Sequence, residues 1–159
     1  MLDAALACRP SNSGLVNLII WYHDAIYDPR CKDNEEKSAD LAIEQLKDHL
    51  SVEDVDIVAG GILLTKHQFG SNLLSRDMSI VVDSDLDILS HHWRYMDYAR
   101  AIRKEYAHLN DAEYIAGRKQ FLEKMLRKNS YYSILYTRNA NAKKNMQMEL
   151  DSLNKDTLL

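Results

Sequence analysis

The residues best suited to chemistry lie in two short segments, the first of which is Trp21–Pro29, with the sequence WYHDAIYDP. His23 and Asp24 are adjacent there in an otherwise apolar stretch, where a buried carboxylate is unfavourable unless it is paired or bound to a metal. A divalent cation compensates such a group by taking an imidazole nitrogen from one residue and a carboxylate oxygen from the next. The alternative is a surface His–Asp pair, or an aspartate hydrogen-bonded by a neighbouring helix, and the dipeptide alone favours this alternative.

The second segment, Val81–Leu89, alternates three aspartates with apolar residues. On a helix Asp83 and Asp87 share a face, whereas Asp85 lies on a more apolar side and is predicted to be the most buried of the three carboxylates. A strand with one acidic face and a solvated helix are the alternatives. A calcium loop does not fit, because Ile88 occupies the position where the loop requires glycine.

The elements that position these residues are predicted to be helices, because five glycines and two prolines are too few for many short strands. Ser51–Asp54 and Asn110–Glu113 resemble capping boxes, and Asn34 is a candidate N-cap. The pair Gly60–Gly61 weakens a helix interior, which a close helix crossing would explain. Helices are expected over about 15–27, 34–50, 51–67, 78–90, 97–107, 110–126 and 137–153.

Length and composition favour one globular domain, because 159 residues with 46% hydrophobic and 28% charged side chains suit a single core. We expect a loose leader over 1–14, a helical domain over 15–153 and a tail over 154–159. The net charge of -4 indicates neither nucleic acid nor an anionic membrane as the main partner.

The sequence shows no sign of membrane insertion or export. Its longest apolar stretch, 15–22, is too short to span a bilayer, and no basic segment precedes it as in a secretory signal. A cytoplasmic location is therefore the default expectation. Cys8 and Cys31 lack the spacing of a metal knuckle and are expected to be plain thiols.

Six spaced blocks of the sequence form a recognisable pattern: Tyr22–Asp24, Tyr27–Pro29, Asn34–Ala39, Thr65–His67, Asp83–Leu89 and Ile102–Tyr106. Together they resemble the HD superfamily of metal-dependent phosphohydrolases, whose signature is a histidine, an adjacent His-Asp pair and a distant aspartate. The similarity is greatest to a bacterial-type branch of predicted HD phosphohydrolases and covers about residues 18–150. It implies an all-α, HD-type helical bundle that hydrolyses a small phosphorylated, nucleotide-like substrate.

The resemblance implies that His23, Asp24 and Asp85 are the ligands of a divalent transition metal. Mixed imidazole and carboxylate ligands suit manganese, iron, cobalt, nickel or zinc without choosing among them. Asp28 would orient the attacking water; its other interpretation is an Asp-Pro helix stop. Lys66 would hold phosphate, as a phosphoryl site needs fixed positive charge.

The resemblance also suggests roles for four further residues. Arg103 is a second candidate for holding phosphate, with a solvated surface cation as the alternative for both it and Lys66. Glu35 and Glu36 are candidates to orient the attacking water or to cap the next helix, and capping is the favoured interpretation. His67 is a candidate further ligand or proton donor.

One departure from the family pattern concerns the first histidine, because the chain has none before His23. This predicts either a missing N-terminal helix or a divergent site with weakened metal affinity. The competing hypothesis is therefore a non-catalytic HD-like helical module that binds a nucleotide or a protein partner. A face left open by a missing helix would also allow a homo-oligomer.

Overall fold

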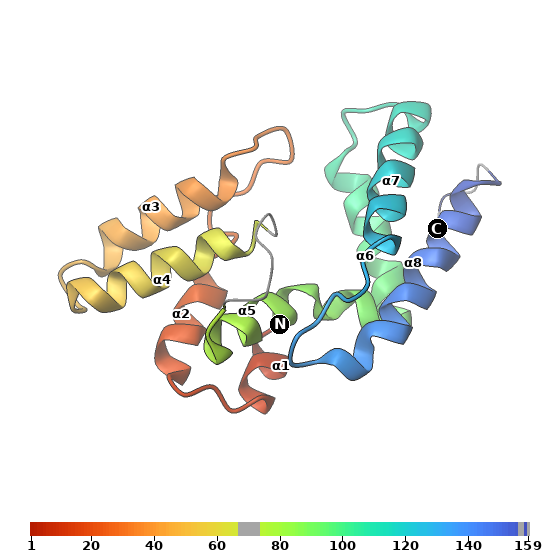
Figure 1. Cartoon of the computed structure of the whole chain (residues 1–159). Helices are drawn as coiled ribbons and strands as arrows, with labels where there is room; N and C mark the ends of the chain where they lie inside the picture. The colour runs from red at the N-terminus through yellow and green to blue at the C-terminus, as the bar shows by residue number, and fades with distance from the viewer. Residues whose placement is uncertain (67–73, 156–157, 159) are drawn as a thin grey trace. The chain divides into compact units, whose positions relative to one another are not determined.

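The computed structural model describes residues 1–66, 74–155 and 158, and within them it consists of helices and connecting segments without a strand. The prediction of an all-α fold is confirmed. No described helix combines the length and apolar character needed to cross a bilayer. The elements, labelled in Figure 1, are α1 (Leu2–Ala7), α2 (Ser13–Tyr22), α3 (Asn34–Leu46), α4 (Val52–Leu64), α5 (Arg76–Asp85), η2 (Leu86–Ser90), α6 (His92–Glu105), α7 (Asp111–Leu126), η3 (Tyr136–Arg138) and α8 (Asn139–Leu153).

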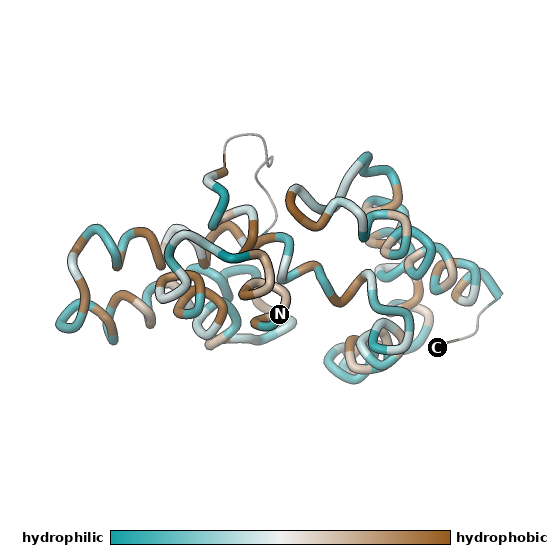
Figure 2. Tube along the Cα trace, turned by 90° about the horizontal axis from the view of Figure 1, so that it is seen from below, coloured by the Kyte–Doolittle hydropathy of each residue, from teal (hydrophilic) through white to brown (hydrophobic). Residues whose placement is uncertain are grey.

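The chain divides into two compact units, Met1–Asp85 and Leu86–Leu159, which we call the N-terminal and C-terminal units. The predicted helical domain 15–153 spans both. In the N-terminal unit α3 and α4 form an antiparallel hairpin, and α2 packs against α4 (Figure 1). In the C-terminal unit α8 packs against α7 and η2. Apolar and polar positions alternate along the helices in Figure 2, as amphipathic helices require.

The segment 1–14, expected to be a loose leader, instead contains α1 and the start of α2. The side chain of Asp77, on α5, accepts hydrogen bonds from the main-chain N–H groups of Ser11 and Asn12, both at 2.8 Å. The guanidinium of Arg76 donates to a main-chain carbonyl of the same segment. These bonds come from residues more than sixty positions away, so the local sequence pattern did not indicate them.

Two of the predicted helix starts are confirmed, and one is wrong. The side chains of Ser51 and Asn110 accept the N–H of the residue three positions on, and the Asn110–Glu113 box is reciprocal. Asn34 is not the cap of α3: Asp33 occupies that position, and the amide of Asn34 binds the preceding loop instead. Cys8 and Cys31 are free thiols, as predicted.

The expected close helix crossing is found at Gly61, where α4 meets α2. A methyl group added at Gly61 would lie 2.4 Å from Cδ1 and 2.9 Å from Cγ1 of Ile19, whose side chain is fully buried. At Gly60 an added methyl group would meet no atom within 4 Å. The two glycines therefore differ: Gly61 allows the helices to approach, whereas Gly60 serves no packing purpose.

The glycine pair supplies a matched experiment. Gly61→Ala is expected to lower the free energy of unfolding by about 1–3 kcal/mol, because the buried Ile19 must shift to admit the new methyl group. Gly60→Ala is expected to raise it by about 0.5–1 kcal/mol, through the helix preference of alanine. Urea denaturation of the two variants checks both signs. Equal effects would contradict the assignment of the close contact to Gly61.

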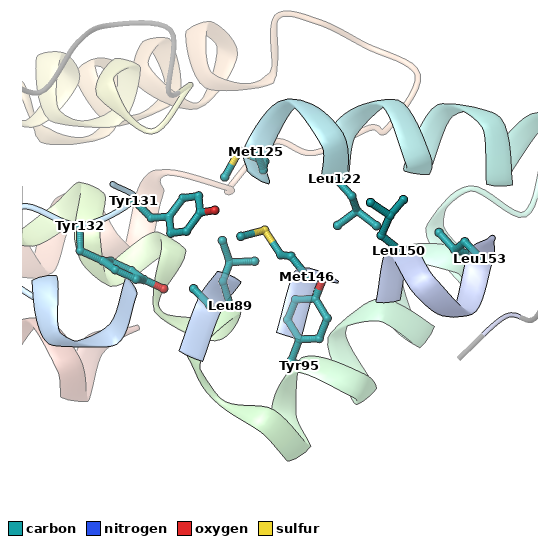
Figure 3. Packing of buried hydrophobic residues seen from close by; sticks show 10 residues of the cluster. Leu89, Tyr95, Leu122, Met125, Tyr131, Tyr132, Met146, Leu150 and Leu153 are labelled. Carbon is teal, nitrogen blue, oxygen red and sulfur yellow. The ribbon is translucent and has the colours of Figure 1, made fainter. Parts of the chain in front are cut away.

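The C-terminal unit has an apolar core contributed by η2, α6, α7, α8 and the segment before η3 (Figure 3). The side chains of Leu122, Met146 and Tyr95 are fully buried in it. Polar groups are buried beside them, since Arg118, Asn145 and Glu149 are each less than a tenth exposed. The core is therefore partly held together by polar contacts.

Candidate functional site

His23, Asp24 and Asp85 come together in the N-terminal unit, as the sequence predicted. His23 caps the C-terminus of α2, Asp24 follows it, and Asp85 is the last residue of α5. Nε2 of His23 lies 3.2 Å from Oδ2 of Asp24 and 3.5 Å from Oδ1 of Asp85. The side chain of His23 is 14% exposed, that of Asp85 24% and that of Asp24 62%, so solvent reaches the site from the Asp24 side.

The second ring nitrogen of His23 fixes the orientation of the imidazole. Nδ1 lies 2.8 Å from the carbonyl oxygen of Ile20, which can only accept a hydrogen bond, so Nδ1 carries a proton. Nε2 is then the nitrogen that faces both carboxylates, either protonated or with a free lone pair. Metal-binding histidines are commonly held this way, with the other N–H donated to a carbonyl or carboxylate.

The charge state of His23 follows from its surroundings. Burial lowers the pKa of the imidazole, but hydrogen bonds to Asp24 and Asp85, and the negative charges of these residues, outweigh it and raise the pKa to about 10. Without a metal, His23 is therefore an imidazolium between two carboxylates at neutral pH.

The donor set can be compared with that of a metal site. Ligand atoms about 2.0–2.2 Å from one ion, at tetrahedral or octahedral angles, lie about 3.0–3.5 Å from each other. The two distances from Nε2 of His23, 3.2 and 3.5 Å, fall in that range, and the donors are the types that divalent transition metals accept. Within residues 1–66, 74–155 and 158, however, no group of three or more His, Cys, Asp or Glu side chains is already arranged to hold an ion.

The prediction that Asp85 is the most buried of the three alternating aspartates is wrong. The residue exposure of Asp83 is only 1% and that of Asp87 is 7%, whereas the Asp85 side chain keeps 24% of its surface exposed. The helix ends at Asp85 and continues as the 3-10 turn η2, so the assumed helical face does not persist through Asp87. Asp85 instead faces His23, which is the contact that its proposed role requires.

Asp28 does not lie at the end of a helix, because α2 ends at Tyr22 and not at about residue 27 as predicted. It lies in the connecting loop, where its carboxylate accepts hydrogen bonds from Nε and Nη2 of Arg30 at 2.9 and 2.7 Å. The same carboxylate accepts the main-chain N–H of Arg30. The prediction that Asp28-Pro29 ends this helix is therefore wrong, since α2 ends six residues before Asp28.

Lys66, a candidate phosphate-binding residue, is engaged with acids of α3. Its ammonium group forms an ion pair with Glu36, lies 4.0 Å from Glu35 and donates to the carbonyl of Lys32 at 2.8 Å. The hydrogen bond from Lys66 lowers the pKa of Glu36. Glu35 and Glu36 occupy the first turn of α3, where acids were predicted, and they also tie the end of α4 to it.

The other basic and histidine candidates have separate surroundings. Arg103 is in the C-terminal unit, where it donates to the carbonyls of Tyr106 and Leu109 and to Asp111, and so closes the turn from α6 to α7. His91 contacts Asp87 at 2.9 Å, and His92 contacts an asparagine of α8. His67 lies outside the described residues.

Sequence reasoning missed the roles of Asn34 and Ser38, two buried polar residues one turn apart on α3. Ser38 hydrogen-bonds both main-chain groups of Ile26, and Asn34 does the same to Asp28. The available signal was a pair of polar residues at i and i+4 beside the apolar stripe of α3.

Comparisons with known protein families, with curated proteins and with solved structures found no match to this chain.

Proposed function

We propose that this protein is a divalent-metal-dependent phosphohydrolase whose metal is held by His23, Asp24 and Asp85. The observation that carries the proposal is the arrangement of His23: the bond from Nδ1 to Ile20 turns Nε2 toward two carboxylates at 3.2 and 3.5 Å. The resemblance of the sequence blocks to HD phosphohydrolases supports the same assignment. The substrate would be a small phosphorylated molecule.

The metal, when bound, would polarise a phosphate oxygen as a Lewis acid and lower the pKa of a water ligand. Before the metal can bind, the ligand residues must be in the right protonation state. His23 gives up the proton on Nε2 and keeps the one on Nδ1, because the carbonyl of Ile20 holds the latter. Asp24, the most exposed of the three ligands, faces the solvent from which substrate arrives.

The roles of Asp28 and Lys66 in this proposal depend on their present contacts. The carboxylate of Asp28 accepts bonds from Arg30 in the loop that follows Asp24, and in this proposal it would orient the attacking water from there. Lys66 would have to exchange Glu36 for a phosphate oxygen, so it would bind substrate only after that ion pair opens. Arg103 already donates to three acceptors in its own unit.

The test measures metal content and phosphoester hydrolysis on one set of proteins. Wild type dialysed against Mn²⁺ or Zn²⁺ is expected to retain about one ion per chain and to cleave p-nitrophenyl phosphate or its bis ester. Asp24→Asn and Asp85→Asn are expected to lose both properties. Asp40→Asn removes the same charge from an exposed position of α3 and serves as the control. Wild type without bound metal, or variants that bind it equally well, would overturn the proposal.

A second candidate function is a non-catalytic helical module that binds a nucleotide or a protein partner. It is favoured by the internal pairing of the candidate charges, since Asp28 is bound to Arg30, Lys66 to Glu36 and His23 to two carboxylates. This function predicts binding without turnover. Hydrolysis that requires metal and Asp85 would exclude it.

A further inference from the structure

Ser38 holds the loop that follows the His-Asp pair by both main-chain groups of one residue. Its hydroxyl accepts the N–H of Ile26 at 3.0 Å and donates to the carbonyl of Ile26 at 3.2 Å. The side chain is fully buried on α3. A buried hydroxyl is unfavourable unless it is hydrogen-bonded, so these two contacts account for a serine at this position.

Asn34 repeats the arrangement one helical turn earlier. Its Oδ1 accepts the N–H of Asp28 at 3.0 Å, and its Nδ2 donates to the carbonyl of Asp28 at 2.9 Å. Asn34 is 8% exposed. The two side chains, at i and i+4 of α3, thus bind alternate residues of the loop, as a neighbouring strand would. We call the two residues the α3 clamp.

Asp24 is the member of the candidate site that depends most on this support. Its carboxylate is 62% exposed, and the contact that the structure gives it is the ion pair with His23. On one side the main chain is fixed by the end of α2, where the N–H of Ala25 donates to the carbonyl of Tyr22 at 3.0 Å. On the other side it is fixed by the bonds from Ser38 to Ile26. Packing does not hold an exposed carboxylate, so its direction is set by the main chain.

We propose that Asn34 and Ser38 are positioning residues that hold Asp24 in place as a metal ligand. This role rests on the proposed function, because it gives the clamp a purpose only if Asp24 binds an ion. It differs from a general contribution to stability, because the clamp acts on the segment that carries a ligand. Groups that hydrogen-bond a metal ligand directly change metal affinity 10–100-fold when removed, and the clamp is expected to act in the same range through the main chain next to Asp24.

The experiment compares Mn²⁺ affinity by isothermal titration calorimetry at a temperature where every variant is folded. Ser38→Ala and Asn34→Ala are each expected to weaken binding 10–100-fold. Ser79→Ala changes a serine that is also buried, but on α5 rather than α3; it is the matched control and is expected to change affinity less than threefold. Ser38→Thr keeps the hydroxyl and is expected to restore most of the affinity.

Amide hydrogen exchange supplies a readout that needs no metal. The N–H of Ile26 is expected to exchange slowly in wild type and rapidly in Ser38→Ala, with no change in Ser79→Ala. A wild type that binds no Mn²⁺ overturns the proposed function and the positioning role together. A wild type that binds Mn²⁺ and a Ser38→Ala variant that binds it equally tightly overturn the positioning role alone. Equal losses in Ser38→Ala and Ser79→Ala would do the same, because the effect would then be one of general stability.

Discussion

Glu149→Gln is expected to lower the free energy of unfolding of the C-terminal unit by about 3–5 kcal/mol, the usual cost of removing one member of a buried ion pair. Glu149 accepts hydrogen bonds from Nε and Nη2 of Arg118 at 2.8 and 3.0 Å and from the hydroxyl of Tyr95 at 2.5 Å. The side chains of the ion pair are only 3% and 7% exposed. Glutamine has nearly the same size, so the loss is one of charge and of acceptors rather than of packing.

The effect is large because the substitution leaves the buried guanidinium of Arg118 without its carboxylate partner. Burial lowers the pKa of Arg118, but the hydrogen bond and charge of Glu149 outweigh it and raise the pKa above its ordinary value. Arg118 stays charged in the variant even without that support, because a guanidinium is not deprotonated in proteins, and it is buried where water cannot replace the carboxylate. The rings of Tyr98 and Phe121, which lie beneath its guanidinium, compensate only part of the charge.

Guanidinium chloride denaturation, followed by circular dichroism, measures the effect. Glu123→Gln is the matched control, because Glu123 pairs with Arg127 on the surface of α7 at 3.8 Å, where both side chains are more than half exposed. That control is expected to change stability by less than about 1 kcal/mol. Equally small losses of unfolding free energy in Glu149→Gln and Glu123→Gln would contradict the large contribution assigned to the buried ion pair. The double replacement Arg118→Met with Glu149→Leu is expected to recover most of the stability.

The sequence predicted the features that depend on nearby residues. The caps at Ser51 and Asn110 were found because each bond joins residues three positions apart. The helix expected over 110–126 was found as α7, because its apolar residues recur at helical spacing. A close helix crossing was predicted for the pair Gly60–Gly61, because glycine in a helix interior is unfavourable without a packing reason, and the structure places the crossing at Gly61 alone.

The sequence failed where packing between distant segments decides the outcome. Asp83 is buried rather than Asp85, although both lie on α5, because the face of α5 that packs is set by distant segments. The loop after Tyr22 replaces the last five residues of the helix predicted over 15–27, and Asn34 and Ser38 supply its main-chain partners from another helix. No local pattern indicated that pairing. Within the candidate site, His23, Asp24 and Asp85 were identified, but the residues that support them were not.

In the metal-free protein, stability is expected to fall as the pH rises from about 6.5 to about 10, because the pKa of His23 is raised from 6.5 to about 10 on folding. The folded state binds the His23 proton more tightly than the unfolded chain does, so this proton adds to the free energy of unfolding. The contribution is complete below the unfolded pKa and is lost as the pH rises through the folded pKa. The loss is expected to be on the order of a few kcal/mol over this window.

Urea denaturation at pH steps between 6 and 10.5 tests this, with His23→Gln as the reference. The variant lacks the titrating group, so the difference between the two curves isolates His23 from tyrosines, lysines and cysteines that also titrate at high pH. A difference that does not change with pH would contradict the raised pKa.

Metal binding should show the opposite dependence on pH if His23 is a ligand. The ion takes the place of the proton on Nε2, so binding releases that proton, and the affinity for Mn²⁺ is expected to rise up to tenfold per pH unit below the folded pKa. A protein in which His23 only forms a structural ion pair would lose stability at high pH without gaining metal affinity. The two pH profiles, measured on the same wild type and His23→Gln proteins, therefore separate a metal centre from an ion pair between α2 and α5.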